Sequence, residues 1–193
     1  MRHDLRLRGY AFELRPIELS DAAFMVGLRT DPELSPLIHP TSPRVEDQRA
    51  WIERYFDRPG DYYFIVVRSS SGRAEGAVAI QEVDVAKRAA EWGRWVMRQD
   101  SMGAPESALL IYRAAFERLG MDRVYCRTAA ANTNVVAFHT SCGLKTMPPN
   151  GLKHNFGGVE YDAVEQYVTK QDWPMTERIL DQRAEAVARL LSR

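Results

Sequence analysis

Hydrophobic and polar residues follow one another along this chain with two different periods, and each period predicts its own kind of element. Alternation within short segments rich in β-branched and aromatic residues predicts strands. These segments are residues 10–15, 62–68, 74–83, 91–97, 124–128 and 159–168. Apolar residues spaced three or four positions apart predict helices. The helical segments are residues 22–30, 43–56, 104–119, 132–142 and 173–191.

The order of these elements predicts one α/β (α+β) domain whose first half is mainly antiparallel, because its middle strands are joined by short polar connections. We expect the domain to cover residues 1–170 and residues 171–193 to add an amphipathic C-terminal helix. That helix either packs on its own domain or lies at the interface of a homodimer. The second helix is predicted to begin at a cap formed by Thr41 or Ser42, with Pro43 in its first turn.

Composition narrows the classes of protein that this chain can belong to. Of its 193 residues, 45% are hydrophobic and 27% are charged, values typical of a globular domain. Lys plus Arg and Asp plus Glu number 26 each, so a net charge of zero favours neither nucleic acid nor a membrane as a partner. The N-terminal residues lack the apolar core of a signal peptide. Two cysteines and four scattered histidines show no disulfide framework and no zinc spacing, so we expect a cytoplasmic protein without a metal.

The segment from Glu91 to Gly103 carries the first chemical signal. A strand runs into a short polar loop, residues 98–103, which opens the most regular helix of the chain. Such a connection directs free backbone N–H groups and the positive end of the helix dipole at whatever lies over the loop, which suits a pyrophosphate. A plain strand–helix connection fits the pattern equally well. One glycine is too few for a dinucleotide-binding loop, and the Gly-Lys-Ser/Thr of a P-loop is missing.

A second signal follows the next strand: Asn132 opens a short helix that contains Phe138 and ends at Gly143-Leu144. This order of elements resembles the acetyl-CoA-binding half of the GNAT acyltransferases. The order is strand, loop, helix and strand, followed by an Asn, a short helix, a Gly and a hydrophobic residue. The loop departs from the family pattern, because Asp100 stands where Arg or Gln is usual and Pro105 where Gly or Ala is usual. An acidic side chain there would repel a phosphate unless it points away, leaving Arg98 or Gln99 to face the phosphates.

The resemblance implies a mixed, mostly antiparallel sheet that is splayed at the acyl-CoA site and flanked by helices. It also implies acetyl-CoA as cosubstrate, with pantetheine paired to the backbone of the strand ending at Arg98. The positions that the resemblance assigns to acetyl-CoA binding are Trp95, Val96, Met97, Arg98, Ser101, Met102, Gly103, Ala104, Asn132 and Phe138.

Two residues match catalytic positions of the family. Glu91 stands where a glutamate on the loop-preceding strand often deprotonates the amine, with Glu82 as a second candidate. His139 aligns with the tyrosine that protonates the departing thiolate, and a histidine can do this because its ordinary pKa is near 6.5. The alternative interpretations are that Glu91 forms a salt bridge on the surface of its strand and that His139 has only a structural role in its helix.

The acceptor is predicted to be a small-molecule amine. The pattern from Asn132 to Gly143 and the strand opening Glu-Trp-Gly are similar to the GNAT branch that acetylates nucleotide-linked amino sugars. A protein N-terminal acetyltransferase, of the type that modifies ribosomal proteins, and a non-catalytic acyl-CoA-binding domain are the alternatives. The acceptor pocket is expected to use the Pro-rich segment 31–43, the second helix and a loop at 147–158. Its candidate contacts are His39, Trp51 and Tyr55, the latter two being equally consistent with a helix core.

Overall fold

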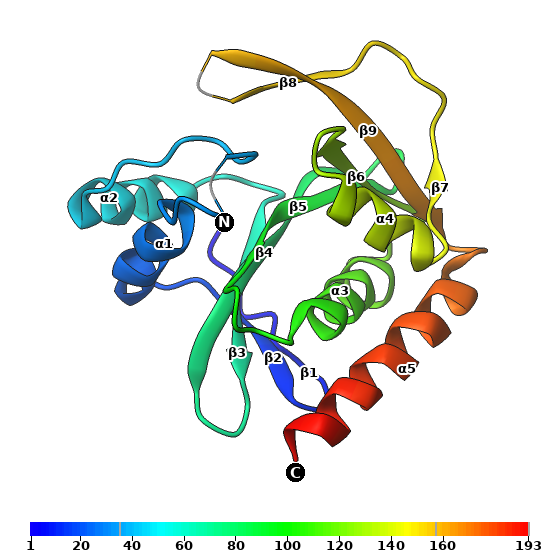
Figure 1. Ribbon diagram of the computed structural model, residues 1–193, viewed down its shortest axis with the longest axis horizontal. Coiled ribbons are helices and arrows are strands. Elements are labelled where there is room, and N and C mark those ends of the chain that lie inside the picture. The colour runs from blue at the N-terminus through cyan, green and yellow to red at the C-terminus, as the bar shows by residue number, and fades with distance from the viewer. Residues whose placement is uncertain (35, 157, 193) are drawn as a thin grey trace.

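One mixed β-sheet organises the protein, whose computed structural model describes residues 1–34, 36–156 and 158–192 (Figure 1). In this part of the chain the strands pair in the order β1-β2-β3-β4-β5-β6-β9-β7, and β8 pairs with β9. Only β5 and β6 are parallel; the other neighbours are antiparallel. The strands are β1 Leu7–Arg8, β2 Phe12–Pro16, β3 Tyr62–Arg68, β4 Arg73–Asp84, β5 Ala89–Met97, β6 Arg123–Ala129, β7 Lys145–Thr146, β8 Lys153–Phe156 and β9 Val159–Thr169.

Helices cover both faces of this sheet (Figure 1). Strand β3 shows why, because its side chains are buried on both sides. Tyr63 and Ile65 pack with α1 and α2, whereas Phe64 and Val66 pack with α3 and α5. Burying each such side chain contributes roughly 1.5–3 kcal/mol. The helices are α1 Ala22–Arg29, α2 Val45–Tyr55, α3 Ala104–Arg113 continued by a π-helical turn Ala114–Arg118, α4 Thr133–Ser141 and α5 Trp173–Leu191.

The C-terminal helix α5 packs along α3. Its first residue, Trp173, stacks on Phe116 at a ring-centroid distance of 5.2 Å. Arg113 of α3 forms ion pairs with Glu177 at 2.8 Å and Asp181 at 3.0 Å. These ion pairs are partly exposed and stabilise little by comparison with the buried aromatic contact. None of the described helices is long and apolar enough to span a membrane.

The parallel strands β5 and β6 separate soon after they meet. They share three residue pairs, ending at Glu91 with Tyr125, after which β6 continues alongside β9 only. On its other side β5 pairs with β4 through an irregular register, and Arg94 within this irregularity has a φ of 49°. The central sheet is therefore open between the second halves of β5 and β6, as the GNAT resemblance predicted.

Two local predictions are wrong. Helix α2 begins at Val45 with the extended residue Arg44 before it, so neither Thr41 nor Ser42 caps it. Both hydroxyls have other partners, because Thr41 accepts a hydrogen bond from Arg29 and Ser42 donates one to Asp47. The predicted loop at 147–158 contains strand β8, which forms a hairpin with β9 that its short, polar sequence does not indicate.

Gly103, which precedes α3, lies so close to Phe12 that a side chain would not fit. A Cβ atom at Gly103 would stand 2.8 Å from the ring of Phe12, which is wholly buried in the core. Gly103→Ala is therefore expected to lower the free energy of unfolding by about 1–3 kcal/mol, measured by urea denaturation.

Gly27, in α1, provides the matched control because a Cβ there would meet nothing within 4 Å. Gly27→Ala is expected to raise stability by roughly 0.5–1 kcal/mol through its helix propensity. Equal stability of the Gly103→Ala variant and the wild type would show that the Phe12 ring can move aside.

Candidate active site

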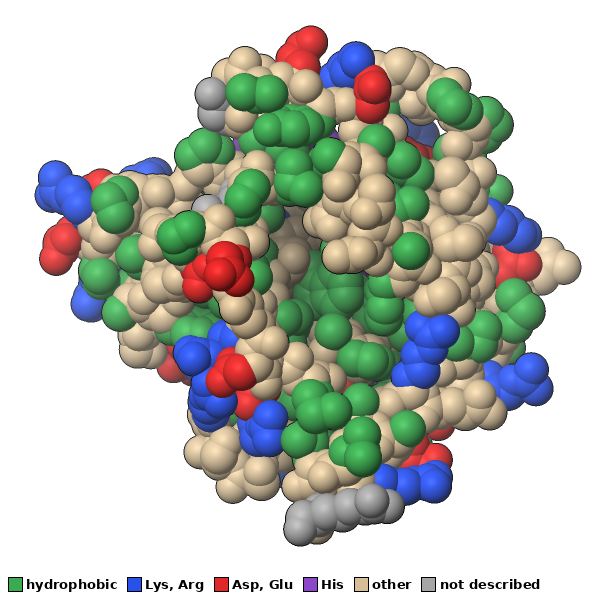
Figure 2. Space-filling model, viewed as in Figure 1, with side chains coloured by type: hydrophobic (Ala, Val, Ile, Leu, Met, Phe, Trp, Pro, Cys, Tyr) green, Lys and Arg blue, Asp and Glu red, His purple; other side chains and the backbone are tan. Residues whose placement is uncertain are grey.

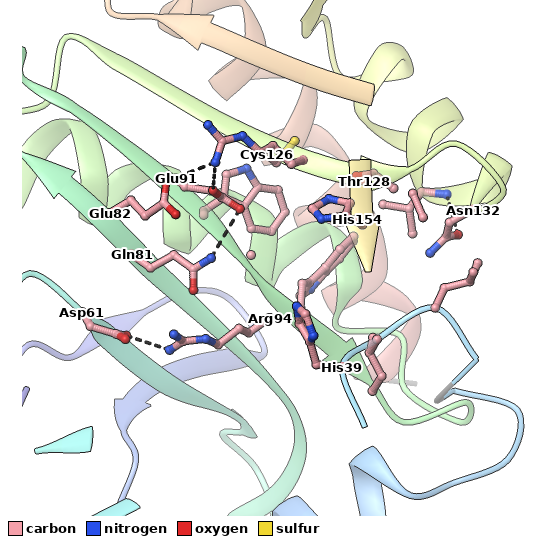
Figure 3. A pocket seen from close by; sticks show the side chains of 18 of the residues that line it. His39, Asp61, Gln81, Glu82, Glu91, Arg94, Cys126, Thr128, Asn132 and His154 are labelled. Carbon is pink, nitrogen blue, oxygen red and sulfur yellow. Dashed lines mark hydrogen bonds and ion pairs between the residues drawn. The ribbon is translucent and has the colours of Figure 1, made fainter. Parts of the chain in front are cut away.

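A cavity of about 580 Å³ lies where β5 and β6 separate. Figure 2 shows a hollow near the centre of the face in view, with hydrophobic side chains around it. Residues of β4, β5, β6 and α4 form the walls, and the loop before α2 and strand β8 contribute from the opposite side. The polar side chains that point toward this space include Gln81, Glu82, Glu91, Thr128 and His154 (Figure 3).

Glu91 is the buried acid at the point where β5 and β6 separate. It is 6% exposed, and it is the last residue of β5 that pairs with β6. One carboxylate oxygen lies 3.0 Å from a guanidinium nitrogen of Arg127, and the other accepts a hydrogen bond from Gln81 Nε2 at 3.3 Å. Burial raises the pKa of Glu91 from 4.5 to about 7, against the opposing effect of the Arg127 charge. Near neutral pH the carboxyl is therefore poised to accept or release a proton.

Arg127 cannot fully neutralise Glu91 because it is shared. The same guanidinium forms ion pairs with Glu82 at 3.1 Å and with Glu165 at 3.3 Å. Three carboxylates thus surround one cation, and the nearby Glu82 charge adds to the rise in the pKa of Glu91. Arg127 is absent from the residues predicted from the sequence, although a charged residue in the middle of a β-rich segment was a visible signal.

His139 lines the same cavity from α4. It is 2% exposed, and its ring lies 5.2 Å from that of Trp92 and 6.0 Å from that of Trp95, measured between centroids. Its Nδ1 atom is buried without a hydrogen-bond partner among the described residues. Burial lowers the pKa of His139 from 6.5 to about 4. The ring is therefore neutral at pH 7, so it can offer a neutral N–H but not an imidazolium proton.

The residues that the resemblance assigned to acetyl-CoA form two groups. Trp95 and Asn132 line the cavity, and Phe138 packs on Trp95 at a ring-centroid distance of 5.3 Å. The side chains of Val96 and Met97 point elsewhere, into the α1–α2 core and against Gly76. Any contact of Val96 with a ligand would therefore involve its backbone.

Glu75 of β4 holds the loop 98–103 on its buried side. Glu75 is fully buried and pairs with Arg68 at 2.6 Å. The hydroxyl of Ser101 donates to Glu75 at 2.7 Å and accepts from the backbone N–H of Gly103 at 3.1 Å. The backbone N–H of Arg98 donates to the carbonyl of Glu75 at 2.8 Å. These bonds hold the loop in one conformation at the start of α3. No local pattern in the sequence marks Glu75 for this role.

Asp100 does not stand alone on this loop. Its carboxylate is exposed and pairs with Arg73 at 2.6 Å and with Arg98 at 3.1 Å, and these hydrogen bonds lower its pKa. Two cations therefore outweigh one anion here. Glu106, in the first turn of α3, turns away from the loop and accepts a hydrogen bond from the backbone N–H of Ala11. The helix N-terminus is thus left available to an anionic ligand.

The predicted acceptor contacts lie in different surroundings. His39 lines the cavity, and its ring lies 5.0 Å from that of Phe156 of β8. Trp51 lines a neighbouring cavity instead. Tyr55 is fully buried, where its hydroxyl bridges the carbonyl of Asp61 and the N–H of Tyr63. In this structure Tyr55 is a core residue.

The open sheet edge beside a helix N-terminus and the buried acid of raised pKa suit an enzyme that binds an anionic cosubstrate and transfers a proton. Residues 12–145 match the family described as the acetyltransferase (GNAT) domain, so the chain belongs to the GNAT acetyltransferases. This family transfers an acyl group from acetyl-CoA to an amine.

Solved structures share the fold. FdhC, described as a nucleotide-linked sugar GNAT, is 25% identical, with a TM-score of 0.79 over 94% of this chain and 99% of its own. A GCN5-related N-acetyltransferase from Brucella melitensis has a TM-score of 0.82 at 18% identity, covering 94% of this chain and 86% of its own. A chimera of the spermidine N-acetyltransferase SpeG from Vibrio cholerae and hSSAT has a TM-score of 0.73 at 16% identity, covering 85% of this chain and 98% of its own. No curated protein matches the chain significantly in sequence.

The raised pKa of Glu91 predicts a dependence of stability on pH. Because folding favours the protonated carboxyl, its contribution is complete below pH 4.5 and is lost as the pH rises through about 7. The loss amounts to about 3 kcal/mol. Glu91→Gln cannot ionise, so its stability relative to the wild type is expected to increase between pH 5 and pH 8 in urea denaturation.

Glu160→Gln, at an exposed position on β9, controls for the removal of one negative charge. The difference in free energy of unfolding between Glu91→Gln and the wild type could instead stay constant from pH 5 to pH 8. That result would show that Glu91 ionises in the folded protein as readily as in the unfolded chain.

Proposed function

We propose that this protein transfers an acetyl group from acetyl-CoA to the primary amine of a small molecule, with Glu91 as the base. The observation that carries the proposal is the position of Glu91 at the point where β5 and β6 separate, in the wall of the cavity. Its pKa of about 7 suits proton transfer at neutral pH.

Acetyl-CoA would supply an activated thioester carbonyl, and this chain would supply its binding groups. The backbone N–H groups of Met102 and Ala104, at the start of α3, fit the phosphates of the cosubstrate, whereas those of Ser101 and Gly103 already donate within the loop. Arg98 adds a positive charge at the same loop. The unpaired edge of β5 from Trp95 onward fits the pantetheine amides, and Trp95 with Phe138 forms an apolar wall beside it.

An amine is protonated at neutral pH and must lose a proton before it can attack. In the proposed reaction, ionised Glu91 takes that proton directly or through water, and its raised pKa makes the transfer more favourable than it would be for an ordinary carboxylate. Arg127, 3.0 Å away, stabilises the ionised form and so keeps part of the population active as a base. The departing thiolate needs a hydrogen-bond donor, for which the neutral ring of His139 is the candidate in the cavity wall.

A nucleotide-linked amino sugar is the acceptor that we favour. The support is the similarity in fold and sequence to FdhC, together with the pattern from Asn132 to Gly143 that includes α4. The cavity also fits a small acceptor, because its volume of about 580 Å³ lies in the range of small-molecule sites, and His39 and Phe156 pack against each other in its wall.

Binding of acetyl-CoA can be measured by calorimetry on the wild type and on Asp100→Ala. We expect micromolar affinity for the wild type, and equal or tighter binding for Asp100→Ala, because the change releases Arg73 and Arg98 from their carboxylate partner. Asp84→Ala, a half-buried change at the far end of β4 and away from the loop, is the control. Binding that is about tenfold weaker in Asp100→Ala would instead make Asp100 a residue that organises the loop.

The acetylation rate is expected to fall by about 10²–10⁴-fold in Glu91→Gln, with little change in acetyl-CoA affinity. Release of CoA is followed with a thiol reagent, using the best acceptor from a panel of amino-sugar nucleotides, polyamines and peptides. The wild-type rate should show an inflection near pH 7, and Glu91→Gln should lack this inflection and keep only the rise that follows deprotonation of the amine itself.

His139→Gln is the comparison within the same cavity. Its rate should be reduced yet keep the wild-type pH profile, because His139 is neutral over that range. A Glu91→Gln variant that keeps both the rate and the pH profile of the wild type would assign the base to another group.

A further inference from the structure

A second cavity, of about 430 Å³, adjoins the first and shares part of its wall. Four residues line both cavities: Arg29, His39, Arg58 and Arg94. The second cavity therefore lies next to the space where the amine of an acceptor would be near Glu91. Arginines dominate the polar lining there, with Arg54 of α2 as the fourth.

The charges of these arginines are poorly balanced. Arg94 pairs with Asp61 at 2.8 Å (Figure 3). Arg29, Arg54 and Arg58 form no ion pair with any described residue. The one acid in the lining, Asp47, is already engaged by Ser42 at 2.6 Å and by Arg44 at 3.8 Å. Three guanidinium groups without a carboxylate partner thus gather around one space, in a chain whose net charge is zero.

Two of these cations are held in place by uncharged groups. Arg29 is half-buried and donates to the hydroxyl of Thr41 at 2.8 Å and to the carbonyl of His39 at 3.0 Å. Arg58 lies over the ring of Trp51, 5.4 Å from its centroid. Such contacts fix a guanidinium without cancelling its charge, which favours a bound anion.

Trp51 has a supporting part in this arrangement. Its ring stacks on Tyr55 at 5.7 Å with an interplanar angle of 6°, and the guanidinium of Arg94 lies 5.7 Å from its centroid, in addition to that of Arg58. The ring of Trp51 is therefore already in contact with protein side chains. We assign it the role of positioning arginines, and we do not assign it a stacking contact with the acceptor.

We propose that the second cavity binds the phosphate of the acceptor, so that the substrate of this enzyme is a phosphate-bearing amine. This inference rests on the proposed function, because it places the amine of the same molecule near Glu91. A phosphate or diphosphate carries enough negative charge to balance several guanidinium groups, and its oxygens match their geometry. A polyamine would bring further positive charge into the same space.

The first test is calorimetric titration with inorganic pyrophosphate, with saturating CoA present to fill the loop at α3. Arg58→Met and Arg54→Met change exposed residues and should leave the fold intact. Each is expected to weaken pyrophosphate binding by about tenfold, the loss that accompanies one charge-assisted hydrogen bond. Arg49 is also exposed and lies on α2, the helix of Arg54, but outside the cavity lining. Arg49→Met should therefore bind pyrophosphate as the wild type does.

The second test compares kcat/KM for an amino sugar, its 1-phosphate and its nucleoside-diphosphate derivative, with spermidine as the cationic counterpart. We expect a phosphorylated form to be preferred at least tenfold, and Arg58→Met to reduce that preference while acetyl-CoA affinity stays unchanged. Preference for the 1-phosphate indicates a sugar phosphate, and preference for the diphosphate indicates a nucleotide-linked sugar.

The outcomes separate the two proposals. Acetylation of spermidine or of the unphosphorylated amino sugar as efficiently as of the phosphates, unaffected by Arg58→Met, would overturn the phosphate site and leave acetyl transfer standing. Failure to bind pyrophosphate would also overturn the phosphate site. Pyrophosphate binding that depends on Arg54 and Arg58, without acetylation of any amine, would support the anion site and refute the proposed function.

Discussion

The separation of β5 from β6 after Glu91 is the constraint on which the rest of the structure depends. Parallel strands normally continue side by side because each backbone N–H and C=O needs a partner. Here the pairing stops after three residue pairs, so the second half of β5 has a free edge on that side. Pairing with β4 on one side of β5 and with β9 on the far side of β6 holds the opening in shape. The cavity is the space that this divergence creates.

The electrostatics of the site follow from that opening. Glu91 is deep enough for burial to raise its pKa, yet close enough to Arg127 to remain ionisable. His139, in an aromatic wall without a charged neighbour, is neutral at pH 7. The basic lining of the second cavity lies farther along the same wall. Two adjoining cavities thus offer a base in one and positive charge in the other, a combination suited to an acceptor with an amine and an anionic group.

The loop before α3 shows how the core supports the surface. Glu75 is buried and holds Ser101 and the backbone of Arg98, while Gly103 lies against Phe12. The conformation of the loop is therefore fixed by groups beneath it. The departure at Asp100 from the family pattern is compensated on the surface, because two arginines pair with its carboxylate.

The sequence by itself determined those features whose signal is local. The bounds of β3 and α5 and the open, mostly antiparallel sheet followed from periodicity and from the family resemblance, and Glu91, Asn132 and Gly103 were visible in short patterns. Only the tertiary structure decided the rest: the contact of Arg127 with Glu91 joins residues 36 positions apart, and the pairing of Asp100 with Arg73 joins residues 27 apart. The arginines of the second cavity likewise come from separate elements. Burial and charge balance are set by packing across such distances, and no local pattern of side chains encodes them.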